Sequence, residues 1–177
     1  MLSHLHITAR QWKTGLKWTL YAALFLLTMV FQTVILAKHP ILGLKLNPVP
    51  LLIVCVCVRE GPEGGGLFAL LASLFWCQSG ADYGNLSVAI LPAGAILSAV
   101  LCRAVLTMRF FPTFLCCLAV SLLHDSVIFA LKLLLAAGRP SYYTETILPS
   151  VLLSMILMPP VYLLVKAVHK TGGSYDL

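Results

Sequence analysis

The chain has 177 residues, of which 60% are hydrophobic and 10% are charged, and its mean hydropathy is +0.96. Soluble domains carry about 25% charged residues because their surface faces water, so this composition excludes a soluble globular domain and indicates an integral membrane protein. The formal net charge of +6 does not indicate a nucleic-acid surface, because the basic residues flank apolar segments instead of lying among exposed aromatic side chains.

The first predicted elements are a basic N-terminal segment, residues 1–17, and a spanning helix, residues 18–37. The N-terminal segment contains Arg10, Lys13 and Lys17, which is typical of an interfacial anchor beside anionic lipid. It is not followed by a small-residue cleavage pattern, so we expect no removable signal peptide. The helix of residues 18–37 contains no charge, and about 20 helical residues cross about 30 Å of hydrocarbon.

Two short apolar runs follow, residues 48–58 and 66–77, separated by the sequence REGPEGGG. They are either two short crossings or one hairpin that enters the membrane and returns, and we favour two crossings. Interrupted segments of this kind lie against other helices, because their free backbone groups need partners from protein or water.

Three longer spans complete the pattern, residues 86–106, 112–137 and 148–168, before a tail of residues 169–177. Proline residues in the fourth and sixth spans are expected to bend them. The loop before the fourth span predicts an outer turn at Gly80, Asp82, Gly84 and Asn85. We therefore expect an all-α membrane protein in which residues 18–168 form a compact bundle of six transmembrane helices, the second and third short.

The placement of basic residues predicts the orientation of this bundle. With the N-terminus inside, eight basic residues fall on the cytoplasmic side: Arg10, Lys13, Lys17, Arg59, Arg103, Arg109, Lys166 and Lys170. Three fall on the outer side: Lys38, Lys45 and Arg139. Because positive residues collect in cytoplasmic loops, both termini are predicted to be cytoplasmic.

The six cysteines lie within or at the edge of apolar runs and lack the paired spacing of a zinc site. They are Cys55, Cys57, Cys77, Cys102, Cys116 and Cys117. We expect them to behave as small hydrophobic residues, and we expect no metal or cofactor.

The fifth span contains the sequence SLLHDSVIFALKLLL, with Asp125 near its midpoint. A charge at that depth costs about 2.5–3.5 kcal/mol, so it should face the bundle interior. Ser121, Asp125 and Lys132 share one helical stripe, whereas His124 points about 100° away. We expect His124, Asp125 and Lys132, with Arg103 from the neighbouring span, to form a buried polar cluster.

Three roles remain open for this cluster. It holds the bundle together or fixes a partner helix, it lines a polar cavity for a small substrate or ion, or His124 and Asp125 form a catalytic pair. The catalytic pair is the least favoured, because adjacent helical residues diverge and no serine or cysteine nucleophile is placed beside them.

The glycine-rich sequence REGPEGGG lacks the lysine and Ser/Thr of a phosphate-binding P-loop. We interpret Arg59, Gly61, Gly65 and Gly66 as a tight turn between two short helices, in which glycine allows the backbones to approach.

The order of these features resembles the MreD family of bacterial rod shape-determining membrane proteins. The resemblance covers about residues 44–168 and lies in Asn47-Pro48 before a short apolar run, an Arg59-x-Gly61 turn with Gly65 and Gly66, a loop with Gly80, Gly84, Asn85 and Leu86, and an acidic residue, Asp125, in the fifth span. The family tends to have an aspartate at the end of the third span, where this chain has Trp76-Cys77-Gln78.

The resemblance implies a six-helix protein of the bacterial cytoplasmic membrane without enzymatic activity. It implies binding of a single-span MreC-type partner and support of lateral peptidoglycan synthesis in cell elongation. The small residues Gly94, Ala95, Ser98 and Ala99 are the candidate partner face, because helices in lipid associate through close packing. The family is also similar in architecture to the substrate-binding subunits of energy-coupling-factor vitamin transporters, so a transport subunit is the alternative.

Overall fold

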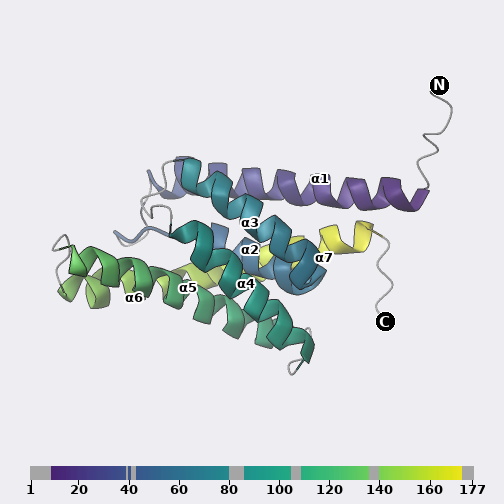
Figure 1. The fold of residues 1–177 in the computed structure, drawn as a ribbon. Coiled ribbons are helices and arrows are strands. Elements are labelled where there is room, and N and C mark those ends of the chain that lie inside the picture. The colour runs from purple at the N-terminus through teal and green to yellow at the C-terminus, as the bar shows by residue number, and fades with distance from the viewer. Residues whose placement is uncertain are drawn as a thin grey trace.

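The computed structural model describes residues 9–38, 40, 43–79, 86–104, 109–135 and 140–172. Within this part of the chain the protein consists of helices joined by short connectors, without a β-strand. The helices lie roughly side by side in one bundle, with α1 along one edge, α4, α5 and α6 along the opposite edge, and α2 and α7 between them (Figure 1).

Among the described residues, four helical segments are long and apolar enough to cross a membrane. The first is α1 (Ala9–Val30), which continues as the π-helical segment η1 (Phe31–Leu36). The second and third are α4 (Ser87–Ala104) and α5 (Phe110–Leu134). The fourth runs through η2 (Tyr143–Ile147), α6 (Leu148–Ser154), η3 (Met155–Leu157) and α7 (Met158–Thr171). The expectation of an all-helical chain with membrane-length apolar helices is confirmed.

The fourth of these segments changes its helical geometry where the two adjacent prolines require it. Pro159 and Pro160 lack an N–H group, and their rings clash with the carbonyl groups of Met155 and Ile156 four residues earlier. The chain forms the 3₁₀ turn η3 over Met155–Leu157, and α7 begins directly after it. The segment thus passes the prolines without leaving a helical path.

Two shorter helices, α2 (Pro48–Glu60) and α3 (Pro62–Gln78), correspond to the two short apolar runs. The sequence REGPEGGG, expected as a turn, is largely helical: only Gly61 lies between α2 and α3. Gly61 has φ +94°, a conformation that glycine adopts without the steric cost of a Cβ atom. One residue therefore reverses the chain where a longer loop was expected.

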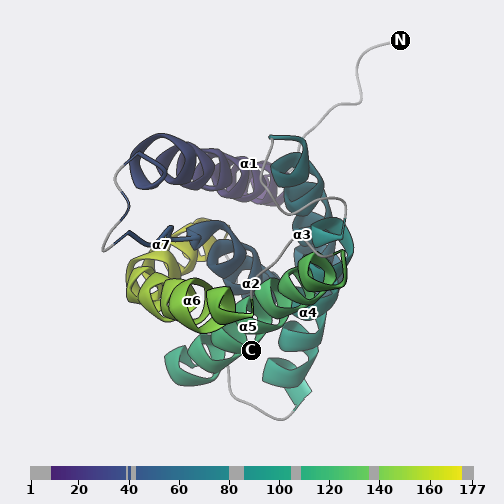
Figure 2. The ribbon, with the colours of Figure 1, turned by 90° about the vertical axis from the view of Figure 1, so that its left-hand side faces the viewer.

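Helix α2 forms the centre of the bundle. All its residues from Pro48 to Val58 are buried, and it packs against α1, α3, α4, α5 and α7. The view along the bundle shows these helices arranged around it (Figure 2). Its 13 residues rise only about 20 Å, so it is much shorter than α1 and α5, which have 22 and 25 residues.

The outer surface of the bundle is apolar. Large hydrophobic side chains are exposed on each of the longer elements, among them Leu27, Leu67, Leu97, Leu123 and Leu163. Soluble monomers rarely expose large contiguous apolar patches, whereas a surface that faces lipid needs them. This distribution agrees with the membrane character of the chain.

Candidate functional site

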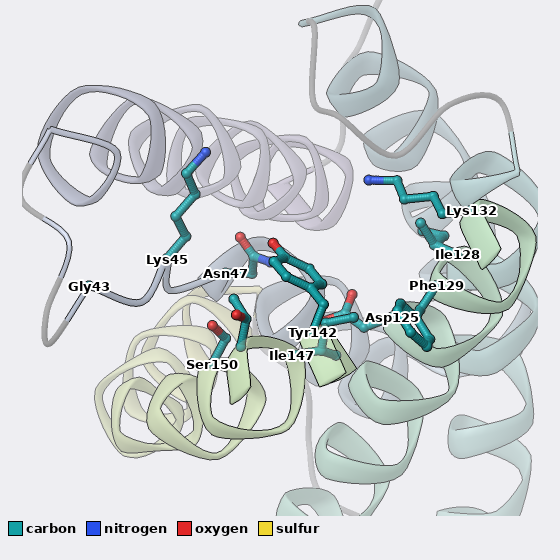
Figure 3. Close-up of a pocket in the computed structure, with 11 residues that line it drawn as sticks. Gly43, Lys45, Asn47, Asp125, Ile128, Phe129, Lys132, Tyr142, Ile147 and Ser150 are labelled. Atoms are coloured by element: carbon teal, nitrogen blue, oxygen red, sulfur yellow. The ribbon is translucent and has the colours of Figure 1, made fainter. Parts of the chain in front are cut away.

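A polar pocket of about 200 Å³ lies at one end of the bundle. It forms where the connector before α2 meets the C-terminal half of α5 and the beginning of the last helical segment (Figure 3). Its lining combines charged, amide, hydroxyl and apolar side chains: Gly43, Lys45, Asn47, Asp125, Ile128, Phe129, Lys132, Tyr142, Thr146, Ile147 and Ser150.

The pocket exists because α2 begins deep inside the bundle. The backbone N–H of Asn47 donates to Ser154 Oγ at 3.0 Å, and that of Val49 donates to Gln32 Oε1 at 3.3 Å. These bonds hold the N-terminus of α2 against the middle of the last helical segment and against η1. Helix α5 has 25 residues and rises about 38 Å, nearly twice the rise of α2. The connector before α2 and the pocket occupy the space beyond the N-terminus of α2, which a helix as long as α5 would fill.

Asp125 at the pocket is held by a chain of hydrogen bonds. His124 Nδ1 lies 2.8 Å from Asp125 Oδ1, and His124 Nε2 lies 3.1 Å from Ser87 Oγ at the start of α4. With the His124 proton on Nδ1, the imidazole donates to Asp125, and Nε2 accepts from the Ser87 hydroxyl. The Trp76 ring of α3 packs on the imidazole, with centroids 6.0 Å apart. The chain of bonds joins α5 to α4 and orients the Asp125 carboxylate.

The order serine, histidine, aspartate is that of a catalytic triad, and it corrects the expectation that no nucleophile lies near His124. Ser87 and His124 are each only 1% exposed, however, so no substrate can approach the Ser87 hydroxyl. The arrangement can position Asp125 and link two helices. Sequence reasoning missed Ser87, and the only available signal was a serine at the beginning of an apolar run.

Lys132 and Arg103 were both expected near Asp125, but they lie in different parts of the structure. Lys132 lines the same pocket as Asp125, and no ion pair between them occurs in the described residues. Arg103 lies elsewhere: a Cβ atom at Gly61 would overlap its guanidinium group. Arg103 follows Ser87 by 16 residues on α4, which is about 24 Å along the helix. The predicted position of Arg103 beside Asp125 is therefore wrong.

A second polar cluster, centred on Glu60, lies at the C-terminal end of α2. Lys17 Nζ of α1 lies 2.6 Å from Glu60 Oε2, while Tyr21 OH and His169 Nδ1 each lie 2.8 Å from Glu60 Oε1. Burial alone would raise the pKa of Glu60, but the hydrogen bonds from Lys17, His169 and Tyr21 together hold it below its ordinary value. We call these four residues the Glu60 cluster, and they join α1, α2 and α7.

Arg59, which precedes Glu60 in the chain, makes a further contact between α2 and α7. Its guanidinium group bonds to the Tyr162 hydroxyl of α7 and also lies over the Tyr162 ring, 4.9 Å from the centroid. Sequence reasoning placed Arg59 in a turn on the cytoplasmic side and gave no role to Glu60, Tyr21 or His169. Their contacts depend on three helices that are distant in sequence.

Close helix contacts account for the other predicted glycines. A Cβ atom at Gly65 would lie 2.5 Å from Cys57 Cα, and one at Gly66 would lie 2.9 Å from the Ile96 side chain. Gly65 thus allows α3 to contact the backbone of α2. The predicted outer turn at Gly80, Asp82, Gly84 and Asn85 lies outside the described residues.

The candidate partner face on α4 is occupied by contacts within the chain. Ala95 and Ala99 are fully buried, Ser98 is buried, and a Cβ atom at Gly94 would lie 2.9 Å from the Val120 side chain of α5. These four small residues allow α4 to pack closely on its neighbours. A partner helix therefore has no access to this face in the folded chain.

The cysteines are free thiols, and five of the six are buried. Two pairs lie close together: Cys55 and Cys117 with sulfur atoms 3.8 Å apart, and Cys102 and Cys116 at 3.7 Å. Among the described residues there is no group of three or more His, Cys, Asp or Glu side chains that could hold a metal ion. No family model, curated protein or solved structure matches the chain.

Proposed function

We propose that this chain is a multi-pass protein of the bacterial cytoplasmic membrane that acts as a non-enzymatic scaffold of cell elongation, as the MreD family does. In this role it binds a single-span MreC-type partner and supports lateral peptidoglycan synthesis. The function lies in the shape of the bundle and in the surfaces that it offers to other membrane proteins.

One observation carries the proposal: the residues of the resemblance that lie around α2 build the centre of this fold. Asn47 and Pro48 begin the buried helix α2, Arg59 and Gly61 end it, and Gly65 brings α3 onto its backbone. A scaffold needs a rigid interior, and α2, which these residues begin and end, packs against five other helices. These residues of the resemblance therefore share one structural role, which is to place α2 at the centre of the bundle.

The contacts at the two ends of the bundle support six crossings with both termini in the cytoplasm. The beginning of α1, the end of α2 and the end of α7 meet in the Glu60 cluster, and the end of α4 reaches the same end through Arg103. Most basic residues assigned to the cytoplasm lie at this end. Lys45 lies at the pocket, toward the opposite end, as expected for alternating crossings.

Labelling of single added cysteines tests this topology. We expect Glu63→Cys, at an exposed position of α3, to react with a membrane-impermeant maleimide only in inverted vesicles, and Lys38→Cys to react only in intact spheroplasts. The wild-type protein gives the background, since five of its six thiols are buried. Reaction of Glu63→Cys from neither side would instead indicate that α2 and α3 form a hairpin within the membrane.

Crosslinking to a partner tests the scaffold role. A photo-crosslinking amino acid is placed at one exposed position on each of five elements, Leu27, Leu67, Leu97, Leu123 and Leu163, and the protein is co-expressed with an MreC-type protein. We expect crosslinks from one adjacent group of these positions and none from the buried control, Ala95. Failure of all five positions, together with no co-purification, would contradict the proposal.

A substrate-binding subunit of a small-molecule transporter is the second candidate, and the pocket beside Asp125 favours it. Ionisable residues inside membrane segments often line substrate pathways. Retention of a vitamin-like compound by the purified protein, identified by mass spectrometry of the extracted ligand, would support this candidate. Co-purification with the MreC-type partner, without a retained vitamin-like compound, would support the scaffold.

A further inference from the structure

The pocket continues inward into a void that contains an unsatisfied polar atom. This void of about 10 Å³ shares Asn47, Asp125 and Ser150 with the pocket and is also lined by Pro50, Ser121, Val151 and Ser154. Ser121 is 7% exposed, and its hydroxyl oxygen has no hydrogen-bond partner. A buried polar atom without a partner is costly, and a void of this size has room for about one oxygen atom.

The charges around the pocket favour an anion. Lys45 and Lys132 provide two ammonium groups against the single carboxylate of Asp125. In Figure 3 the two lysine side chains extend toward the same side of the pocket, while Asp125 and Ser150 lie on the other side. An anionic group is therefore attracted to the lysine side and repelled by the Asp125 side.

The N-terminus of α2 forms part of the inner wall. Asn47 precedes the first residue of α2, and both Asn47 and Pro50 line the inner void. The first N–H groups of α2 do not face a ligand, because those of Asn47 and Val49 donate within the protein and Pro48 and Pro50 have none. The inner wall therefore offers hydroxyl and carboxylate oxygens that accept hydrogen bonds, and the anionic part of a ligand belongs on the lysine side.

We propose that this pocket binds a small hydroxyl-bearing phosphate ester of the glycerol phosphate type. Its phosphate oxygens contact the ammonium groups of Lys45 and Lys132, and its hydroxyl groups donate to Asp125 and occupy the void beside Ser121. Two ammonium groups match a doubly charged phosphate, and about 200 Å³ is below the size of a drug-sized ligand site. The ester is either a free phosphate monoester, which carries two negative charges, or the glycerol phosphodiester headgroup of a lipid, which carries one. Both offer the same phosphate oxygens and hydroxyl groups to the pocket.

The proposal does not depend on the scaffold role. It is also compatible with that role, because a bound ester would hold the connector before α2 against α5 and the last helical segment. The proposal gives each of these polar residues of the pocket a role in binding the ester. Lys45 and Lys132 provide charge, and Asp125 is oriented by His124 to accept a hydrogen bond from a ligand hydroxyl. Ser121 gains the partner that it lacks in the protein alone.

Calorimetric titration in phosphatidylcholine nanodiscs tests the proposal, with glycerol 3-phosphate, inorganic phosphate and glycerol as probes. We expect glycerol 3-phosphate to bind most tightly and glycerol not to bind. The double variant Lys45→Gln/Lys132→Gln should weaken glycerol 3-phosphate at least tenfold. Lys38→Gln, a matched exposed lysine outside the pocket, should bind as the wild type does.

The variant Ser121→Ala tests the inner void independently of the lysine side of the pocket. We expect it to weaken glycerol 3-phosphate several-fold and to leave inorganic phosphate unchanged, because phosphate alone contacts only the lysine side. Equal affinity of the double variant and the wild type would overturn the proposal.

A second measurement, thermal unfolding in nanodiscs of phosphatidylglycerol and of phosphatidylcholine, distinguishes the two sources of the ester. Stabilisation by phosphatidylglycerol that the double lysine variant loses assigns the site to a lipid headgroup. Stabilisation by glycerol 3-phosphate in phosphatidylcholine assigns it to a free ester. If neither stabilises the wild-type protein, the pocket does not bind this class of ligand.

Discussion

The variant Gly65→Ala is expected to lose the folded bundle under conditions in which the wild type is stable. The added Cβ atom would lie 2.5 Å from Cys57 Cα and 2.9 Å from Cys57 O, so the backbones of α2 and α3 must separate. Overpacking against side chains costs about 1–3 kcal/mol, and backbone atoms cannot rotate away, so we expect about 3 kcal/mol or more. Thermal unfolding in detergent, followed by tryptophan fluorescence, measures the loss.

Gly15→Ala is the matched control for this substitution. Gly15 lies in α1, and a Cβ atom there would meet nothing within 4 Å. Because alanine favours a helix over glycine by up to about 1 kcal/mol, the control should be unchanged or slightly stabilised. Equal melting temperatures of the two variants would show that α2 and α3 do not make this close contact.

Glu60→Gln is expected to destabilise the protein by about 3 kcal/mol at neutral pH. The Glu60 side chain is 7% exposed and Lys17 is 13% exposed, so removal of the carboxylate leaves a nearly buried ammonium group without its counter-charge. Breaking a buried ion pair costs about 3–5 kcal/mol, and the residual exposure of Lys17 favours the lower end. Glu63→Gln, at an exposed position three residues later, should have almost no effect.

The pH dependence of this difference has a definite sign. The folded protein holds the pKa of Glu60 below its ordinary value, so its contribution to stability is complete above the unfolded pKa of about 4.3. The contribution is lost as the pH falls through the lower folded pKa. The melting temperatures of wild type and Glu60→Gln should therefore differ at pH 7 and converge below about pH 4. A constant difference down to pH 3 would contradict this account.

The sequence predicted those features of the fold that depend on long apolar runs. About 20 apolar residues are enough to cross hydrocarbon whatever surrounds them, so the four long segments could be recognised from composition. The inward position of Asp125 could be predicted for a similar reason, because a lone charge cannot face lipid at that depth. Neither prediction required knowledge of a neighbouring helix.

Features that depend on neighbours could not be predicted. The REGPEGGG sequence has the composition of a loop, but contact with α2 selects a helix there, and Gly65 is needed for that contact. Helical periodicity gives the face on which His124 lies, but it does not show that Ser87 is the residue opposite, 37 positions away. Arg103 was misplaced because the sequence gives its distance along α4 but not the direction in which α4 runs past Asp125.

The burial of α2 also affects how the polypeptide is assembled during synthesis. Its 13 residues are fewer than the roughly 20 that form an independent span, and α7, which packs against it, follows it in the chain only after α3, α4, α5 and α6. We therefore expect the centre of the molecule to be completed only after translation of α7, while the preceding outer helices enter the bilayer earlier.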